Sequence, residues 1–204
     1  MTGKQKVNGV PVFNQYPELP TGCEATALAM LLNWGGVTVS KYDVVDALPK
    51  GEKVRLVDGE WLGANPEVEF VGDPYSDDDF GVFEKPILQT VEKLASSCKG
   101  INLTGHAFES ILDVIRAGKA VMAWTTIDQK PTYLSKKWMD ENGKIIDWYC
   151  NEHALVITGF DKDNVIVHDP YTGKEEYYQK DLFERNWEAM GKRAITLDIK
   201  SQEK

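Results

Sequence analysis

Cys23 stands at the start of a strongly helical stretch, where a thiol could act as a nucleophile. The residues after it have the apolar spacing of a helix, and Gly35-Gly36 supply a stop signal. Thr21 and Glu24 have the spacing of a capping box, which predicts Thr21 as the N-cap and places the cysteine in the first helical turn. Unpaired backbone N–H groups and the helix dipole favour a thiolate there. The competing interpretation of this cysteine is a small buried hydrophobic residue.

A cysteine nucleophile needs a base that accepts its proton and a third group that fixes this base. His153 opens one apolar run and Asp169 closes the next, so a hairpin would bring both to the same end of a sheet. His106 lies in a loop before a predicted helix and is interpreted as a surface or capping residue. Alone, His153 would be an ordinary strand histidine with satisfied hydrogen bonds. Together with Cys23 and Asp169 it is better interpreted as the base.

The alternation of side chains along a strand constrains this pair. Only one of His168 and Asp169 can share a face with His153. A plain two- or four-residue turn would place His153 opposite Thr172 and turn Asp169 to the other face. A three- or five-residue connection with a bulge would place Ile157 opposite Asp169 and restore the shared face. A catalytic pair therefore predicts the odd-length connection.

Gln15 is the fourth candidate, upstream of Cys23 at the end of a short extended segment. Its side-chain amide could donate a hydrogen bond to the oxyanion that forms during acyl transfer. The competing interpretation is an ordinary loop glutamine.

The predicted helices and strands must position these residues. Most helices precede most strands along the chain, and this order predicts an α+β fold with an antiparallel sheet. We expect one domain over 1–204, with its core at about 10–197. Helices are predicted over 23–34, 40–48, 87–97, 107–117 and 181–190, and strands over 120–127, 144–149, 153–160, 165–169, 175–178 and 194–197.

Local signals support several of these bounds. Ser40 and Asp43 have the spacing of a second capping box, and Pro86 suits the first position of its helix. Gly118 follows the next helix as a stop. Asn142-Gly143 indicates a hairpin turn.

The segment 51–85 has no periodicity, which predicts a long structured loop. Asp77, Asp78 and Asp79 suggest calcium, but the alternating oxygen ligands and distal glutamate of an EF-hand are missing, so a solvated acidic turn is favoured. The aromatic side chains of this segment are expected to pack onto the core, with the wall of a cleft as the alternative. They are Trp61, Phe70, Tyr75, Phe80 and Phe83.

The composition excludes several partners. With 32 acidic and 23 basic residues the net charge is −9, which argues against nucleic acid or an anionic membrane surface. No run approaches the roughly 20 apolar residues of a membrane span. Three cysteines cannot all pair in a disulfide framework. The first ten residues contain no apolar core, so we expect no signal peptide in this chain.

The four candidate residues, in this order, resemble those of the papain-like cysteine peptidases. The resemblance is closest to the bacteriocin-processing (double-glycine leader) peptidases and their stand-alone relatives. It covers most of the chain from 10 to 197, and the block around Cys23 is its most specific part. The matching stretches are Val10-Pro11-Val12-Phe13-Asn14-Gln15, Glu18-Leu19-Pro20-Thr21-Gly22-Cys23-Glu24-Ala25-Thr26-Ala27-Leu28-Ala29-Met30, Gly72-Asp73-Pro74-Tyr75, His153-Ala154-Leu155-Val156 with Gly159-Phe160, and His168-Asp169-Pro170-Tyr171.

This resemblance implies a papain-like fold, in which the helix of the nucleophile packs on a C-terminal antiparallel sheet. It implies Cys23 as nucleophile, His153 as general base, Asp169 as the group that orients the base, and Gln15 as part of the oxyanion hole. The implied reaction is hydrolysis of peptide or related amide bonds through a thioester, without metal or organic cofactor. We expect a peptide or protein substrate, a monomer, and a secreted or cell-envelope location like that of the stand-alone bacterial relatives.

The chain departs from the leader peptidases in ways that limit what is carried over. They are fused to membrane spans and an ATPase, which this chain lacks, and they often have Asp-Cys-Gly where this chain has Gly22-Cys23-Glu24. Only the chemistry of a cysteine peptidase is therefore carried over to this chain, and the cleavage of leader peptides is not. Negative charge from Glu24 and Glu152 is expected to raise the pKa of the thiol. A peptide-binding or adaptor domain with vestigial cleavage is the alternative, and acyl transfer in place of hydrolysis would use the same residues.

Overall fold

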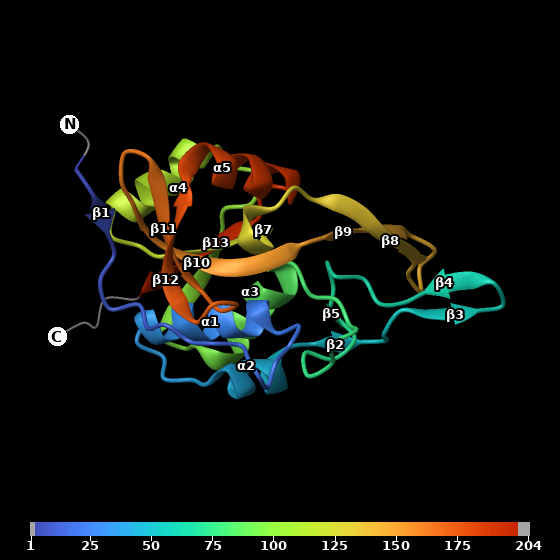
Figure 1. Cartoon of the computed structure of the whole chain (residues 1–204). Helices are drawn as coiled ribbons and strands as arrows, with labels where there is room; N and C mark the ends of the chain where they lie inside the picture. Colours follow the sequence, from blue (N-terminus) through green and yellow to red (C-terminus); the bar gives the residue numbers. More distant parts are fainter. Residues whose placement is uncertain (1–2, 200–204) are drawn as a thin grey trace.

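The main sheet of the computed structural model, which describes residues 3–199, contains seven antiparallel strands. Their order is β12-β11-β10-β7-β13-β6, and β1 pairs with β10 (Figure 1). The predicted α+β class with an antiparallel sheet is confirmed. The strands of this sheet are β1 (Gln5–Lys6), β6 (Cys98–Asn102), β7 (Val121–Thr126), β10 (Glu152–Phe160), β11 (Asn164–Asp169), β12 (Lys174–Gln179) and β13 (Ala194–Ile199).

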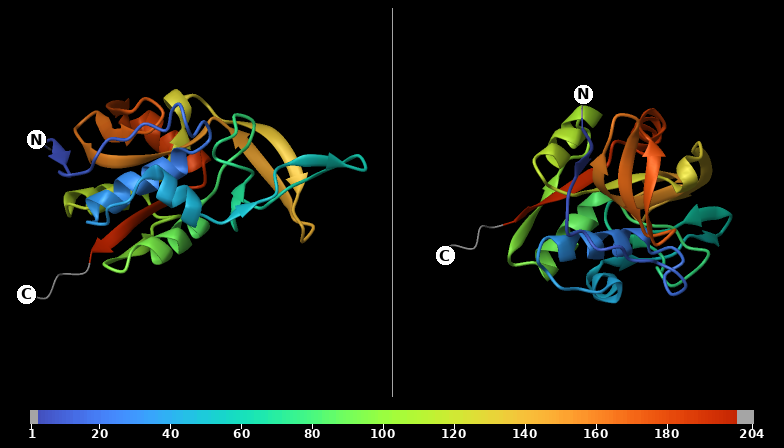
Figure 2. Two further views of the ribbon diagram at one scale, coloured as in Figure 1. Left: turned by 90° about the horizontal axis from the view of Figure 1, so that it is seen from below. Right: turned by 60° about the vertical axis from the view of Figure 1, so that its left-hand side comes forward.

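Helices cover both faces of this sheet. The three helices α1, α2 and α3 lie on one face, and α4 and α5 lie on the other (Figures 1 and 2). Within residues 3–199, no helix has the length and apolar character needed to cross a membrane. The helices are α1 (Cys23–Trp34), α2 (Lys41–Ala47), α3 (Glu84–Leu94), α4 (Phe108–Arg116) and α5 (Lys180–Ala189).

Helix α1 lies at the centre of the molecule, against β10 and β7. Every residue from Cys23 to Leu32 is buried, as expected for a helix that is apolar on nearly all sides. The predicted capping box at its start is wrong: the N-cap is Gly22, and no side chain caps it. The Thr21 hydroxyl instead donates to the carbonyl of Ser76 at 3.0 Å, and the Glu24 carboxylate accepts from the backbone N–H of Val82. Both side chains bind the loop that crosses this helix end.

The other helices begin and end close to the expected residues. The capping box of Ser40 and Asp43 is confirmed, and Gly118 has the positive φ of a residue that follows a helix. Helix α3 differs, because it starts at Glu84, which makes Pro86 the third residue instead of the first. Proline is tolerated anywhere in the first turn, where backbone N–H groups have no partner within the helix.

A second, smaller lobe extends from the end of the main sheet (Figures 1 and 2). Its four-stranded sheet has the order β3-β4-β8-β9 and joins segments that are far apart in the chain. The prediction of one long loop over 51–85 is therefore wrong, and strand β8 was missed. The strands of the lobe are β3 (Arg55–Val57), β4 (Glu60–Leu62), β8 (Tyr133–Met139) and β9 (Ile145–Cys150), with the small pair β2 (Lys50–Gly51) and β5 (Phe70–Val71) at its base.

Aromatic side chains form the core of this lobe. The Phe80 ring lies 4.9 Å from that of Trp138 and 5.4 Å from that of Trp148, and Phe83 stacks on Trp148. The indole N–H of Trp138 donates to the carbonyl of Ala64 at 2.7 Å. Phe80 and Phe83 thus pack onto a core as expected, whereas two other aromatic residues of the segment 51–85 are exposed. These two are Trp61 and Tyr75.

The close approach of β1 to β10 yields a prediction about stability. A Cβ added at Gly159 would lie 2.4 Å from the carbonyl oxygen of Gln5, which is backbone and cannot rotate away. We expect Gly159→Ala to lower the free energy of unfolding by about 1–3 kcal/mol in urea titrations. The matched control is Gly3→Ala, because a Cβ there meets nothing within 4 Å. Equal stability of the two variants would contradict the pairing of β1 with β10.

Candidate active site

The hairpin of β10 and β11 carries two of the predicted site residues, His153 and Asp169. Residues 161–163 join the strands, and a bulge interrupts the pairing between Ile157 and Gly159, so the odd-length connection and the bulge are both present. The register differs from the prediction, because Ile157 lies opposite Val167 and not Asp169. The predicted and observed partners of Ile157 are two residues apart on β11, which is an even number. Asp169 therefore still shares a face with His153.

The His153 and Asp169 side chains are hydrogen-bonded in the interior. Nε2 of His153 lies 2.7 Å from Oδ1 of Asp169, and both side chains are 2% exposed. The Tyr178 hydroxyl donates to Oδ2 of Asp169 at 2.7 Å, and the Tyr171 backbone N–H donates to Oδ1 at 2.8 Å. Burial opposes ionisation of Asp169, but the imidazole and these hydrogen bonds outweigh it and hold the pKa of the carboxyl below its ordinary value. The nitrogen left to face a reaction partner is Nδ1 of His153.

Tyr178 was not among the predicted site residues. It lies on β12 opposite Val165, which places it on the same face of the sheet as Asp169. The sequence indicates a strand at this position. The register that brings the Tyr178 hydroxyl to the Asp169 carboxylate depends on the pairing of β11 with β12, which a loop separates.

Cys23 lies at the start of α1 and lines the same cavity of about 260 Å³ as His153. Its thiol donates to Oε2 of Glu24 at 3.3 Å, and Sγ accepts from the backbone N–H of Ala154 at 3.5 Å. Among residues 3–199, no hydrogen bond joins Cys23 to His153. The structure therefore brings the two side chains to one cavity, with the thiol turned to the glutamate.

Burial is the main cause that raises the pKa of the Cys23 thiol well above its ordinary value. The charges of Glu24 and Glu152 add to this effect, and the hydrogen bond from Ala154 opposes it. The expected influence of the two glutamates is confirmed. The helix N-terminus does not give a thiolate, so the resting cysteine is a neutral thiol.

Glu24 connects the nucleophile to the wall of the cavity. Its carboxylate is fully buried, which raises its pKa to about 7, and Oε1 accepts from the backbone N–H of Val82 at 2.8 Å. The indole N–H of Trp124 donates to the carbonyl of Val82 at 2.9 Å. Both backbone groups of Val82 are thus held by buried side chains.

Glu152 lies beside this group at the start of β10. Its pKa is well above the ordinary value because of burial and the charge of Glu24, although Arg193 opposes the shift. One of its carboxylate oxygens, Oε1, is inaccessible and has no hydrogen-bond partner. Among residues 3–199, the one group of three His, Cys, Asp or Glu side chains close enough to share a metal ion is Cys23, Glu24 and Glu152.

Gln15 is buried and lines the cavity with Cys23 and His153. Its amide nitrogen donates to the carbonyl of Pro20 at 2.8 Å and to that of Leu19 at 3.3 Å. The role of this amide as an oxyanion donor stays a prediction, because it would require one of these bonds to give way.

The remaining histidines lie away from this cavity. His106 is exposed, as expected. His168 lies on the other face of β11, where its ring contacts the carbonyl of Pro11 at 3.0 Å and the Glu175 carboxylate at 3.3 Å. These contacts give His168 a structural role between β11, β12 and the N-terminal segment.

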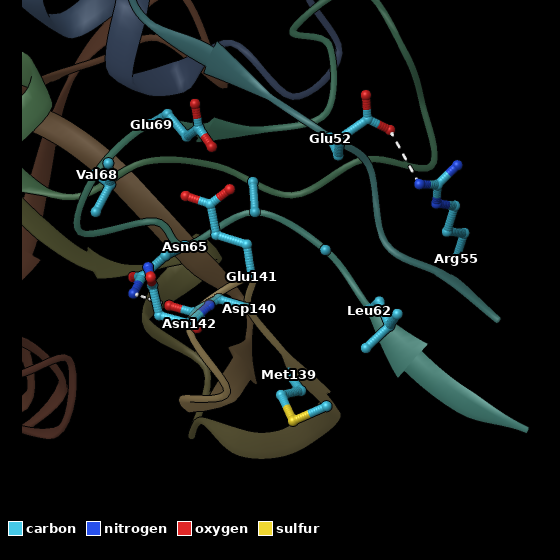
Figure 3. Close-up of a pocket in the computed structure, with 12 residues that line it drawn as sticks. Glu52, Arg55, Leu62, Asn65, Val68, Glu69, Met139, Asp140, Glu141 and Asn142 are labelled. Atoms are coloured by element: carbon cyan, nitrogen blue, oxygen red, sulfur yellow. Dashed lines mark hydrogen bonds and ion pairs between the residues drawn. The ribbon is translucent and has the colours of Figure 1, made fainter. Parts of the chain in front are cut away.

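A separate pocket of about 230 Å³ lies in the projecting lobe and contains none of the predicted site residues (Figure 3). Its polar lining is mainly acidic, and Figure 3 shows the Glu69 and Glu141 carboxylates with the pair of Glu52 and Arg55 around it. Burial, together with the charges of Glu141 and Glu52, raises the pKa of Glu69. The pocket is distinct from the cavity at Cys23.

Comparison with known proteins places this arrangement in context. The family model described as "Peptidase_C39 like family" matches residues 7–195. The Bacillus subtilis protein YvpB, described as uncharacterized, is 32% identical over 199 residues, which are 97% of this chain and 78% of that protein. The crystal structure of a candidate C39-like peptidase from Bacillus anthracis matches with a TM-score of 0.85 and 30% identity, over 98% of this chain and 99% of that one.

A more distant structure shares the fold. It is the double glycine motif protease of an AMS/PCAT transporter in complex with its leader peptide, with a TM-score of 0.51 and 16% identity over 95% of each chain.

The raised pKa of the thiol yields a prediction about its reactivity. In buffer with EDTA, iodoacetamide should alkylate Cys23 slowly at neutral pH and faster as the pH rises, because only the thiolate reacts. Glu24→Gln removes a negative charge beside the thiol and leaves an amide oxygen as the hydrogen-bond acceptor, so labelling at pH 7 should rise about tenfold for each unit by which the pKa of the thiol falls. Mass spectrometry of the labelled peptides measures both rates.

The control for this experiment is Glu60→Gln, an exposed change in the projecting lobe. Labelling of Cys98 or Cys150 while Cys23 stays inert at every pH would contradict its assignment as a nucleophile.

The depressed pKa of Asp169 predicts how stability changes in acid. Because its pKa is lower in the folded chain than in the unfolded chain, at about 3.9, its contribution is full above that value and is lost as the pH falls through the folded value. We expect Asp169→Asn to lower the free energy of unfolding at pH 7 by about 2 kcal/mol. The loss of stability between about pH 4 and pH 2 should also become smaller.

Urea titrations across this pH range measure the effect. Asp78→Asn is the matched control, because the Asp78 side chain is exposed. An unchanged acid dependence in Asp169→Asn would show that the buried pair contributes nothing to folding.

Proposed function

We propose that this chain, which belongs to the Peptidase_C39 like family, hydrolyses peptide bonds with Cys23 as its nucleophile. The family, matched over residues 7–195, supports a function of the cysteine-peptidase type. The observation that carries the proposal for this chain is one cavity that joins the Cys23 thiol to a buried pair of His153 and Asp169, 2.7 Å apart.

In the proposed reaction, Nδ1 of His153 accepts the thiol proton and the Cys23 sulfur attacks the carbonyl carbon of the scissile bond. The resulting tetrahedral intermediate collapses to a thioester, and the imidazolium returns its proton to the departing amine. Water then attacks the thioester while His153 accepts a proton from it. The second tetrahedral intermediate releases the carboxylic acid, and His153 returns the proton to the sulfur.

Asp169 has the role of holding the imidazole in one orientation and stabilising its charged form. Its bond to Nε2 of His153 directs Nδ1 toward the cavity, and its depressed pKa keeps it anionic over the neutral range. The hydrogen bond from Tyr178 fixes Asp169 in turn. This arrangement follows the general logic in which the orienting carboxylate stays ionised during proton transfer.

The oxyanion would form beside the backbone N–H of Cys23 at the helix N-terminus. The amide of Gln15, which lines the same cavity, would supply a second donor once its bond to Pro20 or Leu19 opens. Substrate binding must also turn the thiol from Glu24 toward His153. These two adjustments distinguish the resting site from the reacting one.

The substrate class is a peptide or protein. The cavity is walled by aromatic side chains from four parts of the chain, which suit an extended polypeptide with apolar side chains. They are Tyr16, Phe80, Trp148 and Tyr171. The leader peptide belongs to the distant transporter protease, and the likeness to it supports the fold alone.

A second candidate function is peptide binding with little or no cleavage. It is favoured by the neutral resting thiol and by the hydrogen bond that turns it to Glu24. Under this alternative a peptide occupies the same cavity and is recovered intact after long incubation.

Profiling with a peptide library tests the proposal. The chain should cleave a subset of peptides, and Cys23→Ala or His153→Gln should reduce the rate by about 10³-fold or more. Trapped thioester, detected as a mass increase on Cys23 after acid quenching, would identify the nucleophile. His106→Gln, an exposed histidine change, should leave the rate unchanged. Cleavage that persists in Cys23→Ala would overturn the mechanism, and intact recovery of a tightly bound peptide would favour the alternative.

A further inference from the structure

Three potential metal ligands surround one point beside the cavity. Cys23 Sγ lies 3.3 Å from Oε2 of Glu24, and one ligand atom from each of Cys23, Glu24 and Glu152 lies within 4.8 Å of the others. Oε1 of Glu152 is inaccessible to solvent and has no hydrogen-bond partner. A buried carboxylate oxygen in this position lacks the partner that a protein normally provides.

Within residues 3–199, neither carboxylate forms an ion pair with a lysine or an arginine. Arg193 is the basic residue that acts on Glu152, but its guanidinium is already paired with Glu67 at 2.5 Å and with Glu84. Buried carboxylates in proteins are normally paired with a cation or bound to a metal, because an isolated buried charge is costly. In the described part of the chain, Glu24 and Glu152 have no ion pair with a lysine or arginine, and the basic groups that act on them at longer range are His153 and Arg193.

The backbone beside the carboxylates leaves room for them. A Cβ added at Gly81 would lie 2.2 Å from Oε1 of Glu24 and 3.2 Å from Oε2 of Glu152. Gly81 is itself buried and has no positive φ that would otherwise require glycine. The space for the two carboxyl groups therefore depends on the absence of a side chain at this position.

From this arrangement we propose that Cys23, Glu24 and Glu152 form a Zn²⁺ site, whose fourth position opens into the cavity. A thiolate with two carboxylates suits zinc, which accepts sulfur and oxygen ligands, better than calcium or magnesium, which prefer oxygen alone. Zinc sites with three protein ligands and one open position are a known arrangement.

The distances fit zinc with a small movement. With Zn–S at about 2.3 Å and Zn–O at about 2.1 Å, ligand atoms of a tetrahedral site lie about 3.6 Å apart. The contact between Cys23 and Glu24, at 3.3 Å, already has nearly this length. Glu152 would move by roughly 1 Å, which the absence of a hydrogen bond on Oε1 permits.

Zinc at this site would hold Cys23 as a bound thiolate and release the thiol proton to solvent. One lone pair of the sulfur would then be bound to the metal, so the sulfur would be a weaker nucleophile than a free thiolate. The site would act as a reversible block of the nucleophile. Metal binding itself depends on three side chains and not on peptidase activity, so the two proposals can fail separately.

The test is a titration of the full chain with Zn²⁺ in competition with a chromogenic chelator. We expect binding of one ion per chain, and a thiolate-to-metal charge-transfer band when Co²⁺ replaces Zn²⁺. Cys23→Ser should abolish this band and weaken Zn²⁺ binding at least about 100-fold, and Glu152→Gln should weaken it at least about tenfold. At an alkaline pH where iodoacetamide labels the metal-free chain at Cys23, Zn²⁺ should slow this alkylation, and EDTA should restore it.

Two control variants separate this site from others. Glu60→Gln changes an exposed carboxylate in the projecting lobe, and Cys150→Ser changes a second thiol that lines the same cavity. Both should bind Zn²⁺ like the parent chain, and circular dichroism verifies that every variant is folded. Failure to bind one Zn²⁺ per chain, unchanged binding in Cys23→Ser, or loss of binding in Cys150→Ser would overturn the proposal. If the chain fails to bind one Zn²⁺, the two glutamates share a proton instead of a metal.

Discussion

The hydrogen bond between His153 and Asp169 is the constraint on which the rest of the site depends. Two side chains on neighbouring strands can meet only if they share a face, and the bulge in β10 provides the odd offset that makes this possible. The pair lies at the open end of the β10–β11 hairpin, and β7 and β12 flank this hairpin on either side within the main sheet. Its geometry is therefore fixed by backbone pairing instead of by a flexible loop.

A competition between two electrostatic effects determines the state of the thiol. The dipole at a helix N-terminus stabilises a nearby negative charge by about 0.3–1 kcal/mol. Burial of the thiol and the charges of Glu24 and Glu152 act in the opposite direction and leave the pKa of Cys23 well above its ordinary value. Burial and the two glutamates prevail at Cys23. Position at a helix start is thus a poor guide to thiol reactivity when acidic residues are buried beside it.

Sequence reasoning was most successful where the signal is local or depends on alternation. The start of α1 at Cys23, the capping box at Ser40, and the hairpin that carries His153 and Asp169 all follow from short patterns. It failed where a partner lies far away in the chain. Thr21 and Glu24 have the spacing of a capping box, yet both bind the loop near Val82 and Ser76, which no local pattern reveals.

The projecting lobe and Tyr178 show the same limit. Strands β3 and β4 are three residues each and pair with one another. Strand β4 also pairs with β8, more than 70 residues later, so their segment has no periodicity of its own. Tyr178 reaches Asp169 only through the register of β11 and β12. The residue types of the candidate site are visible in the sequence, whereas the side chains that hold them in place emerge from pairing over long distances.

The two hydrogen bonds of the Val82 backbone limit how this site can change over evolutionary time. Its N–H is held by Glu24 and its carbonyl by Trp124, so one acidic side chain affects the ionisation of the thiol and also anchors the cavity wall. A substitution at position 24 would alter reactivity and shape in a single step. A substitution at position 24 that makes the thiol more reactive therefore keeps the cavity wall in place only if the new side chain still accepts the N–H of Val82.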